Sequence, residues 1–401
     1  MRMRLVHFKM ESAMPAANSI VVMDWLGWRR RRVAPGHRSR VARRRAAAPP
    51  APPLPLLAFP DGTFYSLPYG PCRFPGFGCA GYRGAACGSW LVFPRDDGCF
   101  LVDPFSGATV TLPALSPIRL RPANAAVKYA EREEQTVRIG FTWMDMKFSE
   151  KMEIINKLVV CSPNLVAAFF GSASMQGGGH TSQILVCQPR ASSWSVRALD
   201  QCKEFEDMAF YQGKLYALAV DENLLTVNIS QDPRTGDPQV ARIGQVIKGD
   251  PDPFLEAWWP DDTTGRKKLY LIESCGTLLM VRRKVCCRIS EDAPIVAEQN
   301  KFEVFKADIK HSRWMDVTTL GDDQMLFLGR QCSRAVSASQ YGMSGDQIFF
   351  MDDEMENAAQ YTFDSEENTS VGVYDMRTGE VSSPLPMVWK HGVLLVTWLF
   401  P

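Results

Sequence analysis

Residues 98–113 read GCFLVDPFSGATVTLP, a stretch with the form of a tight β-hairpin. Two short runs of strand-forming residues, 100–102 and 109–112, flank Asp103 and Gly107. An Asp at the start of such a turn accepts hydrogen bonds from nearby backbone N–H groups, and the Gly takes the positive φ that a type I turn with a bulge requires. We therefore expect a hairpin here.

The same frame, Asp-x-x-Ser/Thr-Gly between β-rich segments, occurs twice more in the chain. Asp232 and Gly236 follow LLTVNIS, and Asp375 and Gly379 follow GVY. A single copy occurs by chance in any β protein, but three copies indicate a unit reused around a repeating all-β architecture.

From Phe59 onward, short segments rich in Val, Leu, Phe, Tyr and Trp alternate with clusters of Gly, Pro, Asp and Asn. Examples are Leu215–Ala219, Leu224–Ile229, Leu269–Ile272, Leu278–Val281 and Phe302–Ala307. Roughly 20 such strands are too many for one sandwich, whereas a closed ring of four-stranded blades leaves only short edges. At about 45–50 residues per blade we predict a kelch-like β-propeller of six or seven blades.

Two pairs of similar segments support an internal repeat. GKLYAL at 213–218 is similar to KKLYLI at 267–272, and GDDQ before MLFL (321–328) is similar to GDQ before IFFM (345–351). Two β-sandwich domains are the alternative, but no linker-like break in composition separates two halves between residues 60 and 401.

Charge divides the chain into a basic head and a mildly acidic body. Residues 1–58 hold 12 Lys and Arg against 2 Asp and Glu, and the remaining 343 residues hold 33 against 42, a net charge of −9. This body gives no electrostatic reason to bind nucleic acid over a broad surface. We therefore expect two regions, a disordered Arg- and Pro-rich head (1–58) and a propeller (59–401).

The head contains nine arginines within 17 residues, followed by a proline-rich segment that disfavours a helix. They are Arg29, Arg30, Arg31, Arg32, Arg38, Arg40, Arg43, Arg44 and Arg45. Three interpretations stay open: a nuclear-import or anion-binding patch, an organelle transit peptide, or a solvated tail without a role. The corresponding locations are the nucleus or cytoplasm, with an organelle as the alternative.

The eleven cysteines include no Cys-x-x-Cys pair and follow no secretion signal. We expect free thiols in a reducing compartment. No apolar run approaches the ~18 residues that would span a bilayer, so we predict no membrane segment.

The sequence contains no convincing motif for a catalytic, phosphate-binding or metal site. The glycines at 177–179 precede a strand rather than a helix, which indicates a hairpin loop rather than a phosphate-binding loop. The five histidines lack metal-ligand spacing, and the acidic run from Asp352 to Glu367 lacks the order of a calcium loop. With no nucleophile elbow or paired catalytic carboxylates, we predict no enzyme activity, cofactor or metal, although an enzyme using the propeller channel is a third class to test.

Several stretches together resemble one family. They are 53–68 (PLPLLAFPDGTFYSLP), 88–113, 207–229 (including YQGKLYAL), 302–339, 345–354 and 372–381. In combination and order they resemble the KIB-type propeller, the large plant F-box-associated domain that is abundant in grasses. The resemblance covers about Leu54 to the end of the chain.

This resemblance implies a kelch-type substrate receptor, in which an N-terminal F-box docks the Skp-type adaptor of a cullin–RING ubiquitin ligase. An F-box requires amphipathic helices, but residues 1–58 show no i, i+3, i+4 apolar stripe, so we predict that this head contains no intact F-box and carry no adaptor-binding residue over to this chain. We thus expect a non-catalytic protein-interaction module that binds an unknown protein through its propeller loops. The alternative is a free-standing nuclear or organellar scaffold unrelated to ubiquitination.

Overall fold

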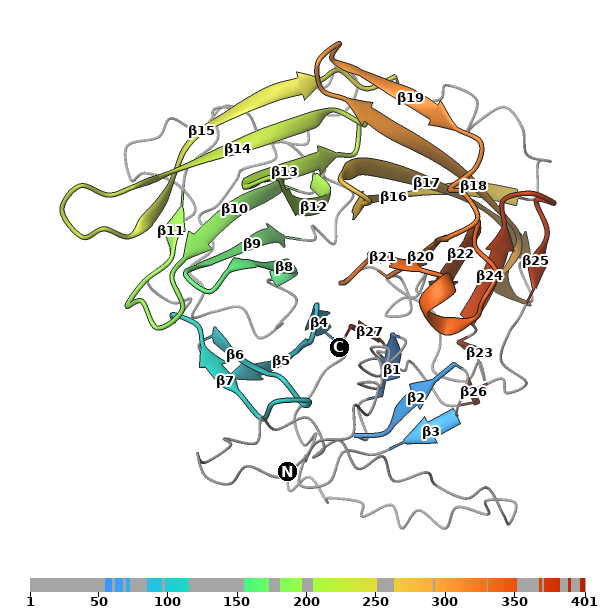
Figure 1. The fold of residues 1–401 in the computed structure, drawn as a ribbon, viewed down its shortest axis with the longest axis horizontal. Coiled ribbons are helices and arrows are strands. Elements are labelled where there is room, and N and C mark those ends of the chain that lie inside the picture. The colour runs from blue at the N-terminus through green and yellow to red at the C-terminus, as the bar shows by residue number, and fades with distance from the viewer. Residues whose placement is uncertain are drawn as a thin grey trace, which may run out of the picture.

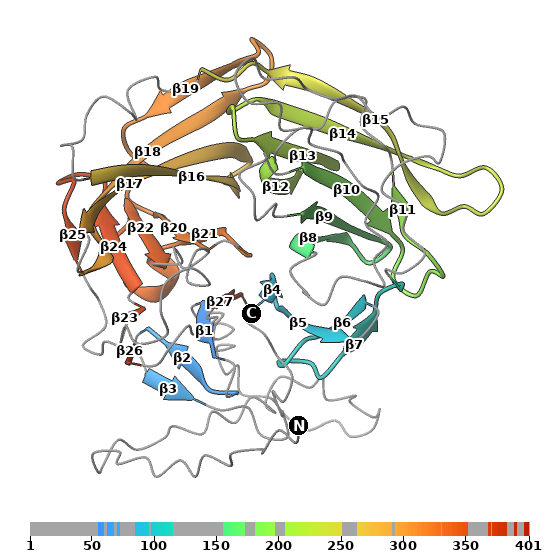
Figure 2. The ribbon, with the colours of Figure 1, turned by 180° about the vertical axis from the view of Figure 1, so that it is seen from behind.

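The computed structural model describes residues 55–59, 62–67, 70–72, 85–95, 98–114, 155–172, 181–196, 205–250, 263–290, 293–329, 331–351, 368–369, 371–382, 389–390 and 397–400. These residues form a ring of six antiparallel or mixed sheets around a central axis (Figure 1), and the reverse view in Figure 2 shows the same ring. Within the described ranges the regular elements are strands and one 3-10 turn, η4 (Ser339–Tyr341).

The first three blades come from the N-terminal half, together with one C-terminal strand. Blade 1 has the order β27 (Thr397–Leu399), β1 (Leu56–Ala58), β2 (Phe64–Ser66) and β3 (Gly70–Cys72). Blade 2 comprises β4 (Ala85–Cys87), β5 (Trp90–Arg95), β6 (Gly98–Val102) and β7 (Thr109–Thr111). Blade 3 comprises β8 (Ile155–Ser162), β9 (Leu165–Ser172), β10 (Thr181–Cys187) and β11 (Ser195–Val196).

The other three blades contain the longer strands. Blade 4 comprises β12 (Phe205–Tyr211), β13 (Lys214–Ala219), β14 (Leu224–Gln231) and β15 (Pro238–Ile247). Blade 5 comprises β16 (Thr263–Ser274), β17 (Thr277–Ser290), β18 (Ala293–Asp308) and β19 (Arg313–Val317). Blade 6 has the order β21 (Arg334–Ser337), β20 (Gln324–Leu328), β22 (Gln347–Met351), β24 (Val371–Asp375) and β25 (Val381–Ser382), and a separate pair joins β23 (Asn368–Thr369) to β26 (Trp389–Lys390).

The ring closes by pairing the two ends of the propeller in one sheet. β27 runs antiparallel to β1, with Leu57 opposite Trp398. The indole N–H of Trp398 donates to the carbonyl of Leu328 in blade 6 at 2.8 Å, and its ring meets Phe327 edge-on at 5.0 Å. The prediction of a propeller is therefore confirmed with six blades, and the two-sandwich alternative is wrong.

Each sheet is buried on both faces, because neighbouring blades pack against it from either side. On β13, Leu215 and Ala217 pack in the apolar cluster with blade 3, whereas Tyr216 and Leu218 pack in the cluster with blade 5. Six such clusters, one at each blade interface, make up the core. This two-sided burial explains why the strands read as nearly continuous apolar runs.

Blade 6 departs from the simple order, and it corrects one interpretation of the sequence. The two similar segments around 321–328 and 345–351 do not mark equivalent strands of two blades. Instead β20 and β22 lie side by side in blade 6 as a parallel pair, with Met325 opposite Gln347. The similar segments 213–218 and 267–272 are not equivalent strands either, since β13 is the second strand of blade 4 and β16 is the first strand of blade 5.

Near the axis, one buried ion pair connects three blades. Lys157 on β8 pairs with Asp207 on β12, and both side chains are buried. Asp207 also accepts the N–H of Leu271 on β16 at 2.8 Å. Burial raises the pKa of Asp207, while the Lys157 charge and these donors oppose that shift. The Asp207 carboxylate thus joins the first strands of blades 3, 4 and 5.

Six cysteines whose side chains the structure describes are free thiols, and their surroundings differ. Cys87, Cys99, Cys187 and Cys332 are buried, Cys161 is half-buried and Cys275 is exposed in the β16–β17 turn. Burial raises the pKa of the Cys87, Cys99 and Cys161 thiols to about 12. Since the thiolate is the reactive form, these thiols are protected from modification in two ways: reagents have little access to them, and they stay protonated.

Replacing Trp398 tests the closure of the ring. We expect Trp398→Ala to lower the free energy of unfolding by about 3–5 kcal/mol, as for other large aromatic truncations in a core. Trp398→Phe should cost less, since it mainly leaves the Leu328 carbonyl without its donor. Urea unfolding measures both, and Val381→Ala, at a side chain 47% exposed, is the control. An alanine variant as stable as this control would show that the closure contributes nothing.

Thiol labelling of the native protein, mapped by mass spectrometry, tests the packing of the blade interfaces. Among the cysteines named above, we expect Cys275 to react with iodoacetamide within minutes and Cys87, Cys99, Cys187 and Cys332 to react only after denaturation. Labelling in denaturant is the control for peptide recovery. Rapid native labelling of Cys87 or Cys332 would contradict the packing of blades 2 and 6 near the axis.

Candidate functional site between blades 4 and 5

The three Asp-x-x-Ser/Thr-Gly segments form the same turn, at β6–β7, β14–β15 and β24–β25. In each, Oδ1 of Asp103, Asp232 or Asp375 accepts the N–H two residues on at 2.7–2.8 Å. The glycine N–H donates to the carbonyl of the same Asp at 2.8 Å, and the glycine φ is 70–75°. The Asp side chains are engaged within their own turns, so these are rigid hairpin corners rather than ligand sites.

Other positions singled out in the sequence lie elsewhere. The nine arginines at 29–45, the glycines at 177–179 and the acidic run from Asp352 to Glu367 fall outside the described residues. His311 is exposed, and its Nδ1 lies 2.8 Å from Oδ2 of Asp308. The described part of the chain contains no group of three or more His, Cys, Asp or Glu that could hold a metal ion. None of its helices is long and apolar enough to cross a membrane.

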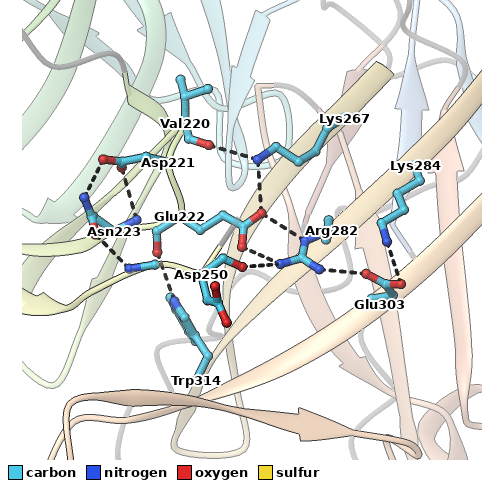
Figure 3. Close-up of polar contacts among 11 residues, drawn as sticks. Val220, Asp221, Glu222, Asn223, Asp250, Lys267, Arg282, Lys284, Glu303 and Trp314 are labelled. Atoms are coloured by element: carbon cyan, nitrogen blue, oxygen red, sulfur yellow. Dashed lines mark hydrogen bonds and ion pairs between the residues drawn. The ribbon is translucent and has the colours of Figure 1, made fainter. Parts of the chain in front are cut away.

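A network of buried charges lies between blades 4 and 5 (Figure 3). It begins in the β13–β14 turn with Glu222, whose side chain is 1% exposed. Oε1 of Glu222 accepts from Nε of Arg282 at 3.0 Å and from Nζ of Lys267 at 3.1 Å, and Oε2 pairs with Nη2 of Arg282. A turn of blade 4 is thereby joined to the first two strands of blade 5.

The turn that carries Glu222 is held by its own hydrogen bonds. Glu222 adopts φ 64°, and its N–H donates to the carbonyl of Ala219 at 2.8 Å. The side-chain oxygen of Asn223 accepts the N–H of Gly249 at 2.7 Å. A Cβ at Gly249 would lie 2.0 Å from the carbonyl oxygen of Asp221, so only glycine allows this close approach.

Arg282 is the centre of the network. Its Nη1 donates to Oε2 of Glu303 on β18 at 2.9 Å, and its guanidinium lies over the ring of Phe305 at 4.7 Å. Burial alone would lower the pKa of Arg282, but the hydrogen bonds and charges of Glu222 and Glu303 raise it. A fork-shaped cation suits this place because it satisfies two carboxylates at once.

Glu303 brings two lysines into the same network. Its Oε1 accepts from Nζ of Lys284 at 2.8 Å and lies 3.4 Å from Nζ of Lys301. Burial would raise the pKa of Glu303, and it is outweighed by Lys284 and Arg282, which lower it. From blade 5, the indole N–H of Trp314 donates to the carbonyl of Glu222 at 3.0 Å and fixes the turn from the other side.

The sequence did not reveal this site. The strand interpretation stopped at Val281, where Arg282, Arg283 and Lys284 begin, whereas β17 continues to Ser290. A run of three cations directly after TLLMV was the available signal, because charges inside a long strand need partners on the neighbouring blade. Glu222 gave no signal, since its partners are 45 and 60 residues away.

Chemically, the network holds fixed charges in place and presents no nucleophile beside a base. A ring of six sheets with rigid turns and a charged blade interface defines the protein as a β-propeller. The chain belongs to the KIB1-4 beta-propeller family, whose family model matches residues 56–375.

Curated relatives from Arabidopsis thaliana carry F-box names. One putative F-box protein is 23% identical over 172 residues, covering 43% of this chain and 42% of the relative. A second is 24% identical over 274 residues, covering 66% and 65%. The F-box protein SKIP23 is 28% identical over 204 residues, covering 47% and 44%. The chain therefore matches less than two thirds of the length of each of these relatives.

Substitutions at Arg282 and Glu222 test whether the network is coupled. We expect Arg282→Met to destabilise the protein by about 3–5 kcal/mol, because it leaves buried Glu222 without its main partner. The double variant Arg282→Met with Glu222→Gln should lose less than the sum of the two single variants. Unfolding curves at neutral pH measure this coupling. Strictly additive losses would show that the two groups do not depend on each other.

Proposed function

We propose that this protein is a non-catalytic protein-interaction module that acts as the substrate-recognition propeller of a plant F-box type ubiquitin ligase. The observation that carries the proposal is the KIB1-4 beta-propeller match over residues 56–375, together with relatives that are named F-box proteins. In this role the ring supplies a rigid frame, and loop side chains supply affinity for a protein substrate.

The geometry of the described loops supports display rather than bond-making. The Asp-x-x-Ser/Thr-Gly turns and the Glu222 turn are each fixed by several hydrogen bonds, so little conformational entropy is lost when a partner binds. The buried thiols, with pKa values raised to about 12, are poor nucleophiles.

A free-standing scaffold is the second candidate, and the basic head favours it. Nine arginines between residues 29 and 45 are suited to nuclear import or to contact with an anionic partner. In this alternative the propeller would bind its partner without any Skp-type adaptor.

Proximity labelling in plant cells, run with the whole chain and with residues 1–50 removed, separates the two candidates, because this deletion takes out the nine arginines and leaves β1 (Leu56–Ala58) in place. If the protein is a ligase receptor, we expect cullin and Skp-type components among the labelled proteins, and retention of the purified adaptor in a pull-down. A scaffold would label partners without cullin components and would retain no adaptor. Loss of nuclear labelling on removing the head would assign the arginines to import.

A further inference from the structure

The β18–β19 hairpin of blade 5 lies at the outer rim of the ring (Figure 1). Asp308 at the end of β18 is the direct partner of Arg313 at the start of β19, so residues 309–312 form the turn, and all four are exposed. The turn lies at the same end of blade 5 as the β16–β17 turn, because Lys306 on β18 is opposite Leu279 on β17. It therefore projects from the sheet instead of packing in a blade interface.

The shape of this hairpin is fixed by Asp308. The carbonyl and Oδ1 of Asp308 each accept the N–H of His311 at 3.2 Å, and Oδ2 lies 2.8 Å from Nδ1 of His311. Nε of Arg313 lies 3.4 Å from the same oxygen. On β19, the indole N–H of Trp314 donates to the carbonyl of Glu222 and anchors the strand to blade 4. Little conformational entropy is therefore lost when a partner binds the hairpin.

Two large apolar side chains are exposed on this hairpin. Ile309 in the turn is 36% exposed, and Met315 on β19 is 43% exposed. In the part of the chain that the structure describes, one other large apolar side chain, Val381, is exposed. Val317 faces the same side of β19 as Met315 and packs against the apolar cluster between blades 5 and 6. A lone exposed apolar side chain is ordinary, whereas two on one fixed hairpin, beside such a cluster, indicate a contact surface.

Two lysines lie beside these apolar side chains. Lys306 on β18 is the direct cross-strand partner of Met315, so the two share one face of the sheet. Lys310 follows Ile309 in the turn. Both lysines are exposed, and neither has a hydrogen bond or an ion pair within the described ranges. Asp316 points to the opposite face, since successive residues of a strand alternate. The two ammonium groups are therefore available to an external anion.

We propose that the β18–β19 hairpin binds a segment of a protein partner in which acidic side chains flank a large apolar side chain. This inference rests on the proposed function, in which the propeller recognises another protein, and it names the loop and the chemistry of the segment. The apolar side chain packs against Met315 and Ile309, and the acidic side chains pair with Lys306 and Lys310. Exposed ion pairs contribute little affinity each, so the apolar contact supplies most of it and the charges set the selectivity. A nucleic acid would meet the lysines but leave Met315 and Ile309 in water.

A peptide-display selection with the purified full chain as bait tests this proposal. The library holds random short peptides, and the variant Met315→Thr is the bait for counter-selection. We expect the enriched peptides to carry Asp or Glu next to Leu, Ile, Phe or Trp, and to be lost on the variant. Fluorescence anisotropy with the most enriched peptide, labelled with fluorescein, then measures the affinity, which should fall as NaCl rises because salt screens exposed charges.

Matched variants locate the contact. Met315→Thr, which keeps a residue suited to a strand, should weaken peptide binding about tenfold through the lost apolar contact. Lys306→Gln and Lys310→Gln should each weaken it about threefold. The controls are Val381→Thr and Lys248→Gln, at an exposed apolar side chain and an exposed lysine outside the hairpin, and both should bind as the wild type does. All five substitutions should leave the urea midpoint unchanged, because these side chains are exposed.

Several results would overturn the proposal. Peptides that bind the wild type and Met315→Thr equally would place the contact on another loop, and a selection without enrichment would show that the hairpin binds no such segment. A lowered urea midpoint for Met315→Thr would make this side chain part of the packing between blades 5 and 6. A dimer in sedimentation that the same variant dissociates would assign the hairpin to a second copy of this chain. The Skp-type adaptor does not enter these assays, so the proposed ligase role and the hairpin contact can fail separately.

Discussion

Burial of every sheet on both faces is the constraint on which this structure depends. A blade taken alone would expose two apolar faces, so each sheet is stable only between two neighbours. The last gap closes when β27 pairs with β1, because this pairing places Trp398 against blade 6 and Leu399 against blade 2. A ring has no terminal sheet, and the apolar pattern of the chain is satisfied only when the ring is complete.

The same constraint decides where charges can lie. Inside the interfaces a charge is tolerated only with a partner from the adjacent blade, as in the pair of Lys157 and Asp207. Toward the ends of long strands the apolar rows give way to polar ones: the row of Leu271, Met280 and Phe305 is followed by Leu269, Arg282 and Glu303, and then by Lys267, Lys284 and Lys301. The charged site is therefore the polar continuation of an apolar blade interface, and most of its side chains remain largely buried.

The sequence predicted what local chemistry determines. Apolar runs and turn residues were enough for an all-β ring, because strand length and turn spacing are local properties. The order of blade 6 was not predictable in this way: β20 and β22 look like repeats, yet they pair in parallel within one sheet because the chain passes through β21 between them. The Glu222 site was missed because its charges meet only once blades 4 and 5 are side by side.

The buried charges between blades 4 and 5 tie the stability of the ring to the contact between two sheets. The carboxylates of Glu222 and Glu303 are placed where Arg282 bonds both, and Lys267 and Lys284 each add a second cation to one of them. Removing any one of these groups would leave a buried charge with fewer partners, which costs more free energy than the pair contributes when it is complete. Because every partner comes from a different strand or turn, the network holds the Glu222 turn against blade 5 without any movement of the blades.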